Sequence, residues 1–455
     1  MATESRAFLA PQAWVNGAWA HDVLLSAGPD GHWLSVQTEA SVAAQRGATR
    51  LAGPVLPGIV NAHSHAFQRA IAGLTERSAS RDDDFWSWRD RMYSAALRIT
   101  ASQLEAVATQ LYAELLQGGY TQVCEFHYLH NDTDGRPYAQ PLELSLALVR
   151  AAQATGIGLT LLPTLYMRSG FGAAGLRPDQ RRFAGTPDSI LQMVEAVNAL
   201  KLPRINAGVA LHSLRAVDAG ALAEVAQAAR LAGWPVHIHI AEQVQEVDDC
   251  MASQGRRPIQ WLLDNVPLDP RWNLVHATHT TPEELQDLHA TGASIVICPS
   301  TEANLGDGMF DFPGWAGQGA RWSIGSDSHV TRAAAQELQL LEYSQRLQQR
   351  QRNVAARAAG SDSTAAVLLQ GAVAGGPAAC GLPLAGIAVG QRADFCVLDP
   401  DSSALAGIPA DRVLDAWVFS APQASPGQTY TGGQLVCQPR PDRRMFVQAM
   451  KQLWP

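Results

Sequence analysis

The feature that most constrains the fold is an alternation of short apolar runs with longer segments of helical periodicity, repeated along most of the chain. The intervening segments, such as 101–119 and 216–234, carry apolar residues at spacings of three and four, and several end at glycine, as helices commonly do. Eight strands that alternate with helices predict an α/β fold, a (β/α)8 barrel of the TIM type. The predicted strands cover 55–63, 121–128, 158–166, 205–213, 235–241, 272–278, 293–300 and 321–328.

Both ends of the chain depart from this alternation. They hold short strand-like pieces separated by turn residues, among them Asn16-Gly17, a common β-hairpin turn. Neither end alone offers enough strands for a hydrophobic core, so we expect the two to combine in a small β-sandwich that flanks the barrel. The charged and aromatic segment 80–92 is expected to be a loop or lid after the first strand. The predicted division is a β-sandwich of residues 1–54 and 386–440, a catalytic barrel of residues 55–385 and a C-terminal helix over 441–455.

Charge and composition limit the class of partner. The 455-residue chain has a formal net charge of −8 and a pI near 5.9, which argues against a nucleic-acid surface. It shows no basic and apolar leader and no apolar stretch of membrane-spanning length, so we expect a cytoplasmic protein without membrane contact. The six cysteines form no C-x-x-C pair, which argues against a sulfur-based zinc site.

Polar residues cluster at the ends of the predicted strands. In a (β/α)8 barrel these ends meet at one rim, where the reacting groups of barrel enzymes lie. A single histidine in such a place is usually a hydrogen-bonded core residue. Many histidines on one rim could hardly all find backbone partners, and a bound metal ion would explain the crowding. The residues at these ends are His63, His65, Glu125, His127, Tyr128, His212, His237, His239, Glu242, His276 and Asp327.

The residue types suit a site for one metal ion. His63 and His65 are two apart in one strand and therefore point to the same side. His239 and Asp327 would complete a set of three imidazoles and one carboxylate. This set suits Zn²⁺ with one position open for water, and Fe²⁺ would fit the same ligands.

Several histidines compete for a place in the site. The alternation of side chains along a strand does not show which of His237 and His239 is the ligand, because both face the same side of their strand. His239 is preferred because it lies nearer the strand end and forms H-x-x-E with Glu242, so His237 is expected to be an inward core residue. His276 ends the apolar run "NLVH" and is also expected in the site. The remaining histidines of this region, His127, His279 and His329, are left without an assigned role.

The motifs, taken in order, resemble those of the amidohydrolase superfamily of metal-dependent deaminases and hydrolases. They are "LPGIVNAHSH", "HIHIAE", "HATH", "CPSTEANLGDG", "IGSDSH" and "GQRADFCVLDP", spread over residues 54–400. The resemblance implies a barrel with a flanking β-sandwich built from both chain ends. No lysine that could bridge two metals is evident on the fourth predicted strand, where His212 lies, and this favours the deaminases that use one metal.

Further stretches resemble the formimidoylglutamate deiminase family within that branch, namely "NAHSHAFQRAIAGLTE", "DDFWSWRDRMY", "CEFHYLHND" and "LHSLRAV". The resemblance implies a zinc-dependent homodimer that hydrolyses N-formimino-L-glutamate to N-formyl-L-glutamate and ammonia, a step of histidine degradation. It places the metal on His63, His65, His239 and Asp327, catalysis on Glu242, His276 and Asp327, and substrate binding on Gln68, Arg89, Tyr128, His212 and Arg215.

The chemistry of these side chains agrees with that assignment. A metal ion makes water nucleophilic near neutral pH, and Asp327 can take the proton that the water loses. Glu242 can pass a proton to the departing nitrogen, while His276 can stabilise the developing charge. The substrate carries two carboxylates, which arginine binds in a bidentate manner, and this suits Arg89 and Arg215.

Three other interpretations stay open. The nearest is a deaminase on the same scaffold that acts on a purine, pterin or cyanuric-type ring, whose site would need apolar and aromatic walls more than arginines. The second is hydrolysis of an amide or a guanidine at the same metal. The third is a non-catalytic barrel for binding or assembly, which has no need of four metal ligands together with an acid and a base.

Overall fold

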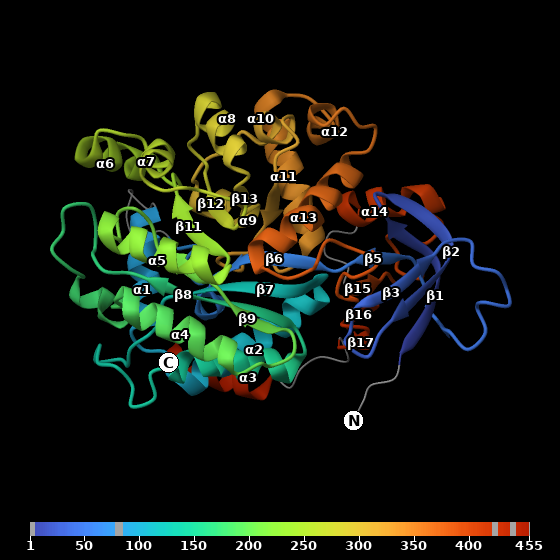
Figure 1. Ribbon diagram of the computed structural model, residues 1–455, viewed down its shortest axis with the longest axis horizontal. Helices are drawn as coiled ribbons and strands as arrows, with labels where there is room; N and C mark the ends of the chain where they lie inside the picture. Colours follow the sequence, from blue (N-terminus) through green and yellow to red (C-terminus); the bar gives the residue numbers. More distant parts are fainter. Residues whose placement is uncertain (1–4, 78–84, 421–425, 437–442, 455) are drawn as a thin grey trace.

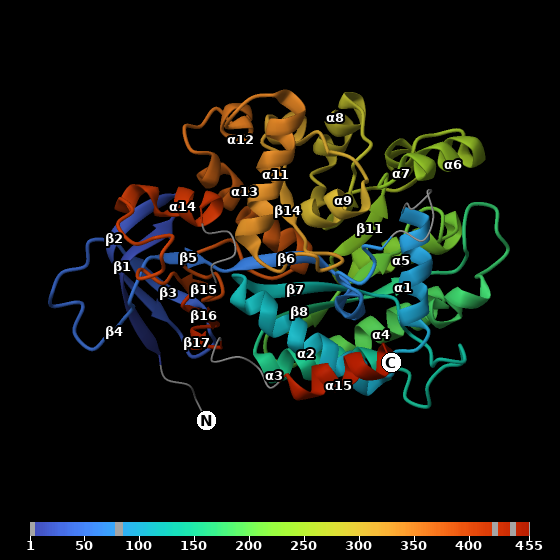
Figure 2. The same cartoon turned by 180° about the vertical axis from the view of Figure 1, so that it is seen from behind.

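Two β-structures organise the chain: a parallel barrel surrounded by helices, and a smaller sheet at one side of it (Figure 1). The computed structural model describes residues 5–77, 85–420, 426–436 and 443–454. Figure 2, the view from behind, shows the C-terminal helix α15 (Arg444–Leu453) on the outside of the barrel beside α2 (Ala101–Gln117) and α3 (Glu143–Thr155). The last helix of the chain therefore packs against the helical layer of the barrel.

The barrel is a closed ring of parallel strands. Each strand hydrogen-bonds to the next, and pairing of β10 with β8 closes the ring. The (β/α)8 fold predicted from the alternation is therefore confirmed. Around the ring the strands are β6 (Ile59–Ser64), β7 (Tyr120–His127), β8 (Gly158–Leu165), β9 (Ile205–Ala207) with β10 (Val209–Leu211), β11 (Val236–Ile240), β12 (Trp272–His276), β13 (Ser294–Ile297) and β14 (Trp322–Ile324).

Two glycines divide strands that the sequence pattern predicts as single runs. The run 55–63 forms β5 (Val55–Pro57) in the flanking sheet and β6 in the barrel, separated by Gly58. A β-carbon on Gly58 would lie only 2.4 Å from Oγ1 of Thr121, so the backbone passes too close to its neighbour for any side chain. The fourth predicted strand likewise consists of β9 and β10, interrupted at Gly208.

The flanking sheet draws its strands from both chain ends. The Asn16-Gly17 turn joins its first two strands, as predicted. β5 lies between β1 and β15, so the chain enters the barrel from the middle of this sheet. The strands form one hydrogen-bonded sheet that curls around an aromatic core, where the rings of Phe395 and Tyr430 stack with centroids 4.3 Å apart. In order they are β17 (Gln434–Leu435), β16 (Gln428–Thr431), β15 (Phe395–Val397), β5, β1 (Arg6–Val15), β2 (Ala18–Ala27) and β3 (Trp33–Gln37), with β4 (Thr49–Arg50) beside β1.

The barrel helices begin and end where local chemistry favours it. The carboxylate of Asp218 accepts the N–H of Ala221 at 2.9 Å, which caps α5, and that helix ends at Gly233 in the left-handed region at φ 72°. Together with α5 (Ala219–Ala232), this part of the fold contains α4 (Pro187–Ala199), α6 (Val244–Gln254), α7 (Pro258–Asn265), α8 (Pro282–Thr291), α9 (Pro299–Leu305), α10 (Phe312–Ala316), α11 (Ala334–Gln349), α12 (Val354–Ala358) and α14 (Val413–Phe419). The 3-10 helices are η1 (Ala66–Ala70), η2 (Pro178–Phe183) and η3 (Ala410–Arg412).

Helix α13 (Thr364–Cys380) closes the end of the barrel at which the strands begin. Its last turn offers carbonyl oxygens to the barrel interior: that of Ala379 lies 2.8 Å from Nε2 of His237, and that of Ala378 accepts Nδ2–H of Asn273 at 3.0 Å. These contacts join α13 to β11 and β12 inside the barrel.

Helix α1 (Phe85–Ala96) corrects the expectation of a loop over 80–92. From Phe85 onward the segment is helical and buries one face, including Met92, against the core; residues 78–84 lie outside the described part of the chain. The expectation of a lid rested on aromatic residues that belong to this helix. Among the described residues, no helix combines the length and apolar character needed to cross a membrane.

Candidate active site

The four predicted metal ligands converge at the C-terminal rim of the barrel. His63 and His65 lie on β6, His239 on β11, and Asp327 follows β14. Nε2 of His63 lies 3.0 Å from Nε2 of His239 and 3.5 Å from Oδ1 of Asp327. Nε2 of His65 lies 3.3 Å from the same oxygen. All four side chains are buried, so four polar groups from three separate strands share one small volume.

Backbone carbonyls orient two of these imidazoles. Nδ1 of His65 lies 2.9 Å from the carbonyl oxygen of Phe126, and Nδ1 of His239 lies 3.0 Å from that of His212. A carbonyl oxygen only accepts, so each Nδ1 carries the proton and each Nε2 turns a lone pair to the site. Burial lowers the pKa of both imidazoles, which keeps them in the neutral form that binds metals.

The donor set fits a divalent cation. With zinc–nitrogen bonds of about 2.0–2.1 Å, the ligand atoms of a tetrahedral site lie about 3.3 Å apart. The separations of 3.0 to 3.5 Å between these nitrogen and oxygen atoms match that value. Two nitrogen lone pairs 3.0 Å apart repel each other unless a proton or a cation lies between them. The residues therefore fit the predicted metal, and their assignment as its ligands stays a prediction.

A carboxylate and an imidazole lie beside this group. Oε1 of Glu242 lies 3.7 Å from Nε2 of His276, and that nitrogen lies 3.8 Å from Oδ2 of Asp327. Burial raises the pKa of Glu242 to about 7, so its carboxyl group can hold or release a proton near neutrality. Burial opposes a charge on His276, but the carboxylate of Glu242 raises the pKa of that imidazole above its usual value. The pair has the properties that proton transfer requires.

The backbone is strained where two of these side chains leave it. His276 has φ 70° and Asp327 has φ 44°, both in the left-handed region that residues with a β-carbon seldom adopt. The N–H of Asp327 donates to the carbonyl oxygen of His63 at 3.0 Å, which holds this conformation. Strain of this kind is concentrated at functional sites.

Two carboxylates without a role in the sequence analysis contact the predicted catalytic pair, Glu242 and His276. Oε1 of Glu302 lies 3.4 Å from Nδ1 of His276 and accepts the N–H of Cys298 at 2.8 Å. Glu246 accepts the N–H of Glu242 at 3.0 Å. Glu302 follows a proline by three residues at a helix start, where carboxylates satisfy free N–H groups, and this signal in "CPSTEAN" could have revealed it.

Glu125 supports the strand that carries the first two histidines. It was noted at a strand end but given no role. Its carboxylate accepts Oγ–H of Ser64 and the N–H of Ala66, both at 2.6 Å. These bonds hold Ser64 and Ala66, the residues on either side of His65. Glu125 therefore fixes the position of His65 through its two neighbours in the chain.

The five predicted substrate-binding residues share one pocket beside the predicted ligands. Its free space is about 40 Å³, far below the roughly 300–1,000 Å³ typical of ligand sites. Phe85, Trp88 and Met92 of α1 form part of its wall. The predicted substrate-binding residues that line this pocket are Gln68, Arg89, Tyr128, His212 and Arg215.

Several polar atoms in this pocket have no partner within the described part of the chain. They are Nε of Arg89, Nη1 of Arg215 and Oε1 of Gln68, all buried. The amide N–H of Gln68 donates to the hydroxyl of Tyr128 at 3.1 Å, which turns its free oxygen elsewhere. Both guanidinium groups lie over the ring of Trp86, at 4.3 Å for Arg89 and 5.8 Å for Arg215. Unpaired buried donors are costly, so the pocket is prepared for an anion.

The remaining histidines lie apart from this pocket. The ring of His127 packs edge-on against that of His130, with centroids 5.5 Å apart. Nδ1 of His329 lies 3.0 Å from Oγ of Ser326, and its Nε2 lies 3.4 Å from Oγ of Ser64. The pocket lining includes none of His127, His237, His279 and His329.

Comparisons with known proteins agree with this fold. Residues 55–436 match the model of the amidohydrolase family. Over 454 residues the chain is 44% identical to formimidoylglutamate deiminase of Pseudomonas aeruginosa, covering 98% of this chain and 99% of that protein. A crystal structure of an amidohydrolase from Brucella melitensis superposes with a TM-score of 0.92 at 42% identity, covering 99% and 100% of the two chains. An adenosine deaminase from Xanthomonas campestris with bound zinc has a TM-score of 0.80 at 20% identity, covering 98% and 97%, and bears on the fold alone. The chain is a member of the amidohydrolase family.

Proposed function

We propose that this protein hydrolyses N-formimino-L-glutamate to N-formyl-L-glutamate and ammonia. The observation that carries the proposal is the pocket wall on which buried nitrogens of Arg89 and Arg215 have no partner among the described residues. A substrate with two carboxylates supplies an acceptor for each arginine. The relative with 44% identity is a formimidoylglutamate deiminase, which supports the same substrate for this chain.

One divalent cation, zinc in this proposal, would be held by Nε2 of His63, His65 and His239 and by the carboxylate of Asp327. When bound there, the cation supplies Lewis acidity that makes water a nucleophile near neutral pH. The protein's own contribution is to keep the imidazoles neutral by burial and to fix two of them through backbone carbonyls. Fe²⁺ suits the same ligands, so metal content is part of the test below.

Protons would be handled by three side chains next to the reacting carbon. Water adds to the amidine carbon, and the imine nitrogen leaves as ammonia, so protons must move from one to the other. Asp327 accepts a proton from the attacking water, and Glu242, with its pKa raised by burial to about 7, delivers one to the leaving nitrogen. His276, held by Glu302 at Nδ1, points Nε2 toward both carboxylates and stabilises the charge that develops on oxygen.

The rest of the pocket would fix the substrate in place. Arg89 and Arg215 bind the two carboxylates, and the free Oε1 of Gln68 accepts an N–H of the amidine. The ring of His212 packs against that of Tyr166 with centroids 4.1 Å apart and an angle of 34° between the ring planes, and both His212 and Tyr128 line the pocket. Each end of the substrate therefore meets a group of complementary charge or hydrogen-bonding type.

The test is an ammonia-release assay with N-formimino-L-glutamate on protein whose metal content has been quantified. We expect turnover that depends on one equivalent of divalent metal. Formamidine, which lacks the carboxylates, and adenosine, which presents a ring, serve as comparison substrates. Faster ammonia release from adenosine than from N-formimino-L-glutamate would replace this proposal with the ring-deaminase interpretation.

Three further expectations from the sequence stand as proposals. We propose a cytoplasmic homodimer, to be checked by light scattering of the purified protein and by cell fractionation. The division into a β-sandwich domain, a barrel and a C-terminal helix is proposed with the boundaries given above. Limited proteolysis would support it if the first cleavages fall close to those boundaries.

A further inference from the structure

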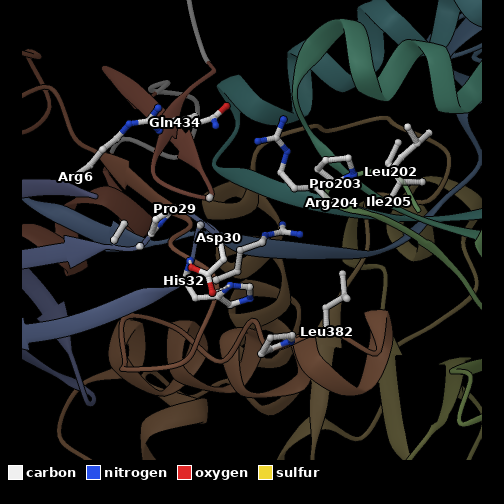
Figure 3. A pocket seen from close by; sticks show the side chains of 16 residues that line it. Arg6, Pro29, Asp30, His32, Leu202, Pro203, Arg204, Ile205, Leu382 and Gln434 are labelled. Carbon is white, nitrogen blue, oxygen red and sulfur yellow. Dashed lines mark hydrogen bonds and ion pairs between the residues drawn. The ribbon is translucent and has the colours of Figure 1, made fainter. Parts of the chain in front are cut away.

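A second and larger cavity lies at the opposite end of the barrel from the pocket with the predicted ligands. It has a volume of about 560 Å³ and opens between the flanking sheet and the start of β9 (Figure 3). Arg204 directly precedes β9 in the chain, which places the cavity where the parallel strands begin. None of the residues assigned above to metal, catalysis or substrate lines it. It therefore has no part in the proposed reaction.

Residues from two distant parts of the chain face each other across this cavity. In Figure 3, Arg6 and Gln434 come from the flanking sheet, while Arg204 and Ile205 come from the barrel side. Close approach of two turns forms one edge, because a β-carbon on Gly31 would lie 3.1 Å from Cα of Gly432. A molecule bound here would touch both β-structures of the protein.

The polar lining is predominantly cationic. Three arginines line the cavity, and Arg392 is the only one of them with an ion pair among the described residues, to Asp394 at 2.6 Å. Arg6 donates Nη1–H to the carbonyl oxygen of Gly433 at 2.9 Å and meets no carboxylate within the described chain. Arg204 has neither a hydrogen bond nor an ion pair from its side chain within the described chain, and burial together with the charge of Arg392 lowers its pKa.

Arg392 also has one hydrogen-bond donor without a partner, although it forms an ion pair. Its side chain is 7% exposed, and its Nη1 is buried with no hydrogen-bond partner in the described part of the chain. The nearest lining carboxylate, Asp30, is already taken, since it accepts the N–H of His32 at 3.2 Å and lies 3.3 Å from that imidazole. Three guanidinium groups therefore line the cavity, and the carboxylates beside them are already paired and do not balance their charge.

The remaining lining is apolar. Side chains of Leu202, Pro203, Ile205, Leu382 and Pro383 form one wall. The volume falls within the roughly 300–1,000 Å³ that small-molecule sites occupy. An apolar wall beside guanidinium groups suits a molecule with a carbon body and an acidic group.

We propose that this cavity binds a small organic anion, a carboxylate or a phosphate monoester with an apolar portion, through Arg6 and Arg204. Arginine offers a planar pair of N–H donors to either oxyanion, which is why the two classes share one site. The apolar portion lies against Leu202 and Ile205. The bound anion connects the flanking sheet to the barrel.

The test is isothermal titration of the metal-loaded, full-length protein with three probes: benzoate, phenyl phosphate and inorganic phosphate. We expect one equivalent of benzoate or phenyl phosphate to bind, inorganic phosphate to bind more weakly because it lacks the apolar portion, and the preferred organic probe to identify the oxyanion class. Arg204→Met and Arg6→Met should each weaken binding about tenfold or more, while Arg230→Met, an exposed arginine on α5, should leave it unchanged.

Two further measurements separate this cavity from the arginines at the opposite end of the barrel. Binding should survive Arg215→Met, and Arg204→Met should turn over N-formimino-L-glutamate as the unaltered protein does. Absence of binding at millimolar probe, equal binding by Arg204→Met and the unaltered protein, or loss of binding in Arg215→Met would each overturn the proposal. None of these outcomes depends on whether the protein deiminates its proposed substrate.

Discussion

His237 and His239 occupy the same strand, face the same side and are both buried, yet they have opposite surroundings. His239 donates Nδ1–H to the carbonyl oxygen of His212 and turns Nε2 toward Nε2 of His63, another predicted ligand, at 3.0 Å. His237, one step lower in the barrel, has its Nε2 2.8 Å from the carbonyl oxygen of Ala379 on α13. Nε2 of the first imidazole therefore points into the predicted metal site, whereas Nε2 of the second meets a backbone carbonyl of the fold.

This difference holds for the two ends of the barrel as a whole. At the rim, carbonyls and carboxylates orient side chains so that reactive atoms point into a pocket. At the other end, α13 closes the interior with backbone carbonyls. Substitutions at the rim should therefore change activity with little effect on stability, and substitutions under α13 should do the reverse. The following predictions run from the largest expected effect on activity to the smallest.

Replacement of a predicted ligand should have the largest effect. His239→Asn is expected to remove most of the bound metal and to lower kcat/KM by about 1,000-fold or more. Metal analysis of the purified variant and the ammonia-release assay would measure both quantities. Full metal content in this variant would show that His239 is not a ligand.

Replacement of the proposed proton carrier should separate catalysis from metal binding. Glu242→Gln preserves size but cannot carry a proton, so kcat should fall by about 100- to 10,000-fold. The metal content should stay at the level of the unaltered protein, as measured on the same preparation. Unchanged kcat would remove Glu242 from the mechanism.

The proposed carboxylate clamp should affect only substrates with carboxylates. Arg215→Met is expected to raise KM for N-formimino-L-glutamate and to lower kcat/KM by about 10- to 100-fold. Formamidine, which offers nothing for an arginine to bind, should be hydrolysed equally well by both proteins. An equal loss with both substrates would mean that Arg215 supports the pocket without binding a carboxylate.

The carboxylate behind His276 should contribute less. Glu302→Gln keeps an oxygen near Nδ1 of His276 but removes the charge, and kcat should fall about tenfold with KM little changed. Steady-state kinetics would resolve the two constants. A rise in KM at constant kcat would place Glu302 in substrate binding instead.

The smallest effect on activity is expected at the closed end of the barrel. His237→Leu leaves the carbonyl of Ala379 without its partner, which should lower the free energy of unfolding by about 1–3 kcal/mol. Turnover per bound metal should stay within about twofold of the unaltered protein, because no atom of the pocket moves. Thermal unfolding and the ammonia assay would measure both, and a collapse of turnover at full stability would contradict the distinction between the two ends.

The predictions from sequence were most successful where a periodic pattern narrows the possible folds. Eight strands that alternate with helices favour a closed barrel, and histidines two apart on a strand share a face, so His63 and His65 could be placed together. Asp327 could be added because the strand ends meet at one rim. The flanking sheet was also predictable, because neither chain end could form a core alone.

The pattern failed where tertiary contacts decide the outcome. Gly58 splits a strand because Thr121 lies against the backbone, a contact between residues far apart in the chain. Segment 85–96 is a helix because its apolar face packs on the core, although its charges suggested a loop. The role of Glu302 depends on a turn that brings it behind His276. The partner of His237, the carbonyl oxygen of Ala379 on α13, lies far away in the chain, so no spacing on the strand of His237 can reveal it.

The position of β5 has a consequence for how the protein is made. Its neighbour on one side, β1, is synthesised before it, but its neighbour on the other side, β15 (Phe395–Val397), follows it by more than 300 residues and leaves the ribosome much later. Until then, the strand that leads into the first two histidines keeps one hydrogen-bonding edge open. The nascent chain must therefore either delay the burial of β5 or shield that edge with a chaperone, and truncation ahead of Phe395 should produce aggregates instead of a smaller enzyme.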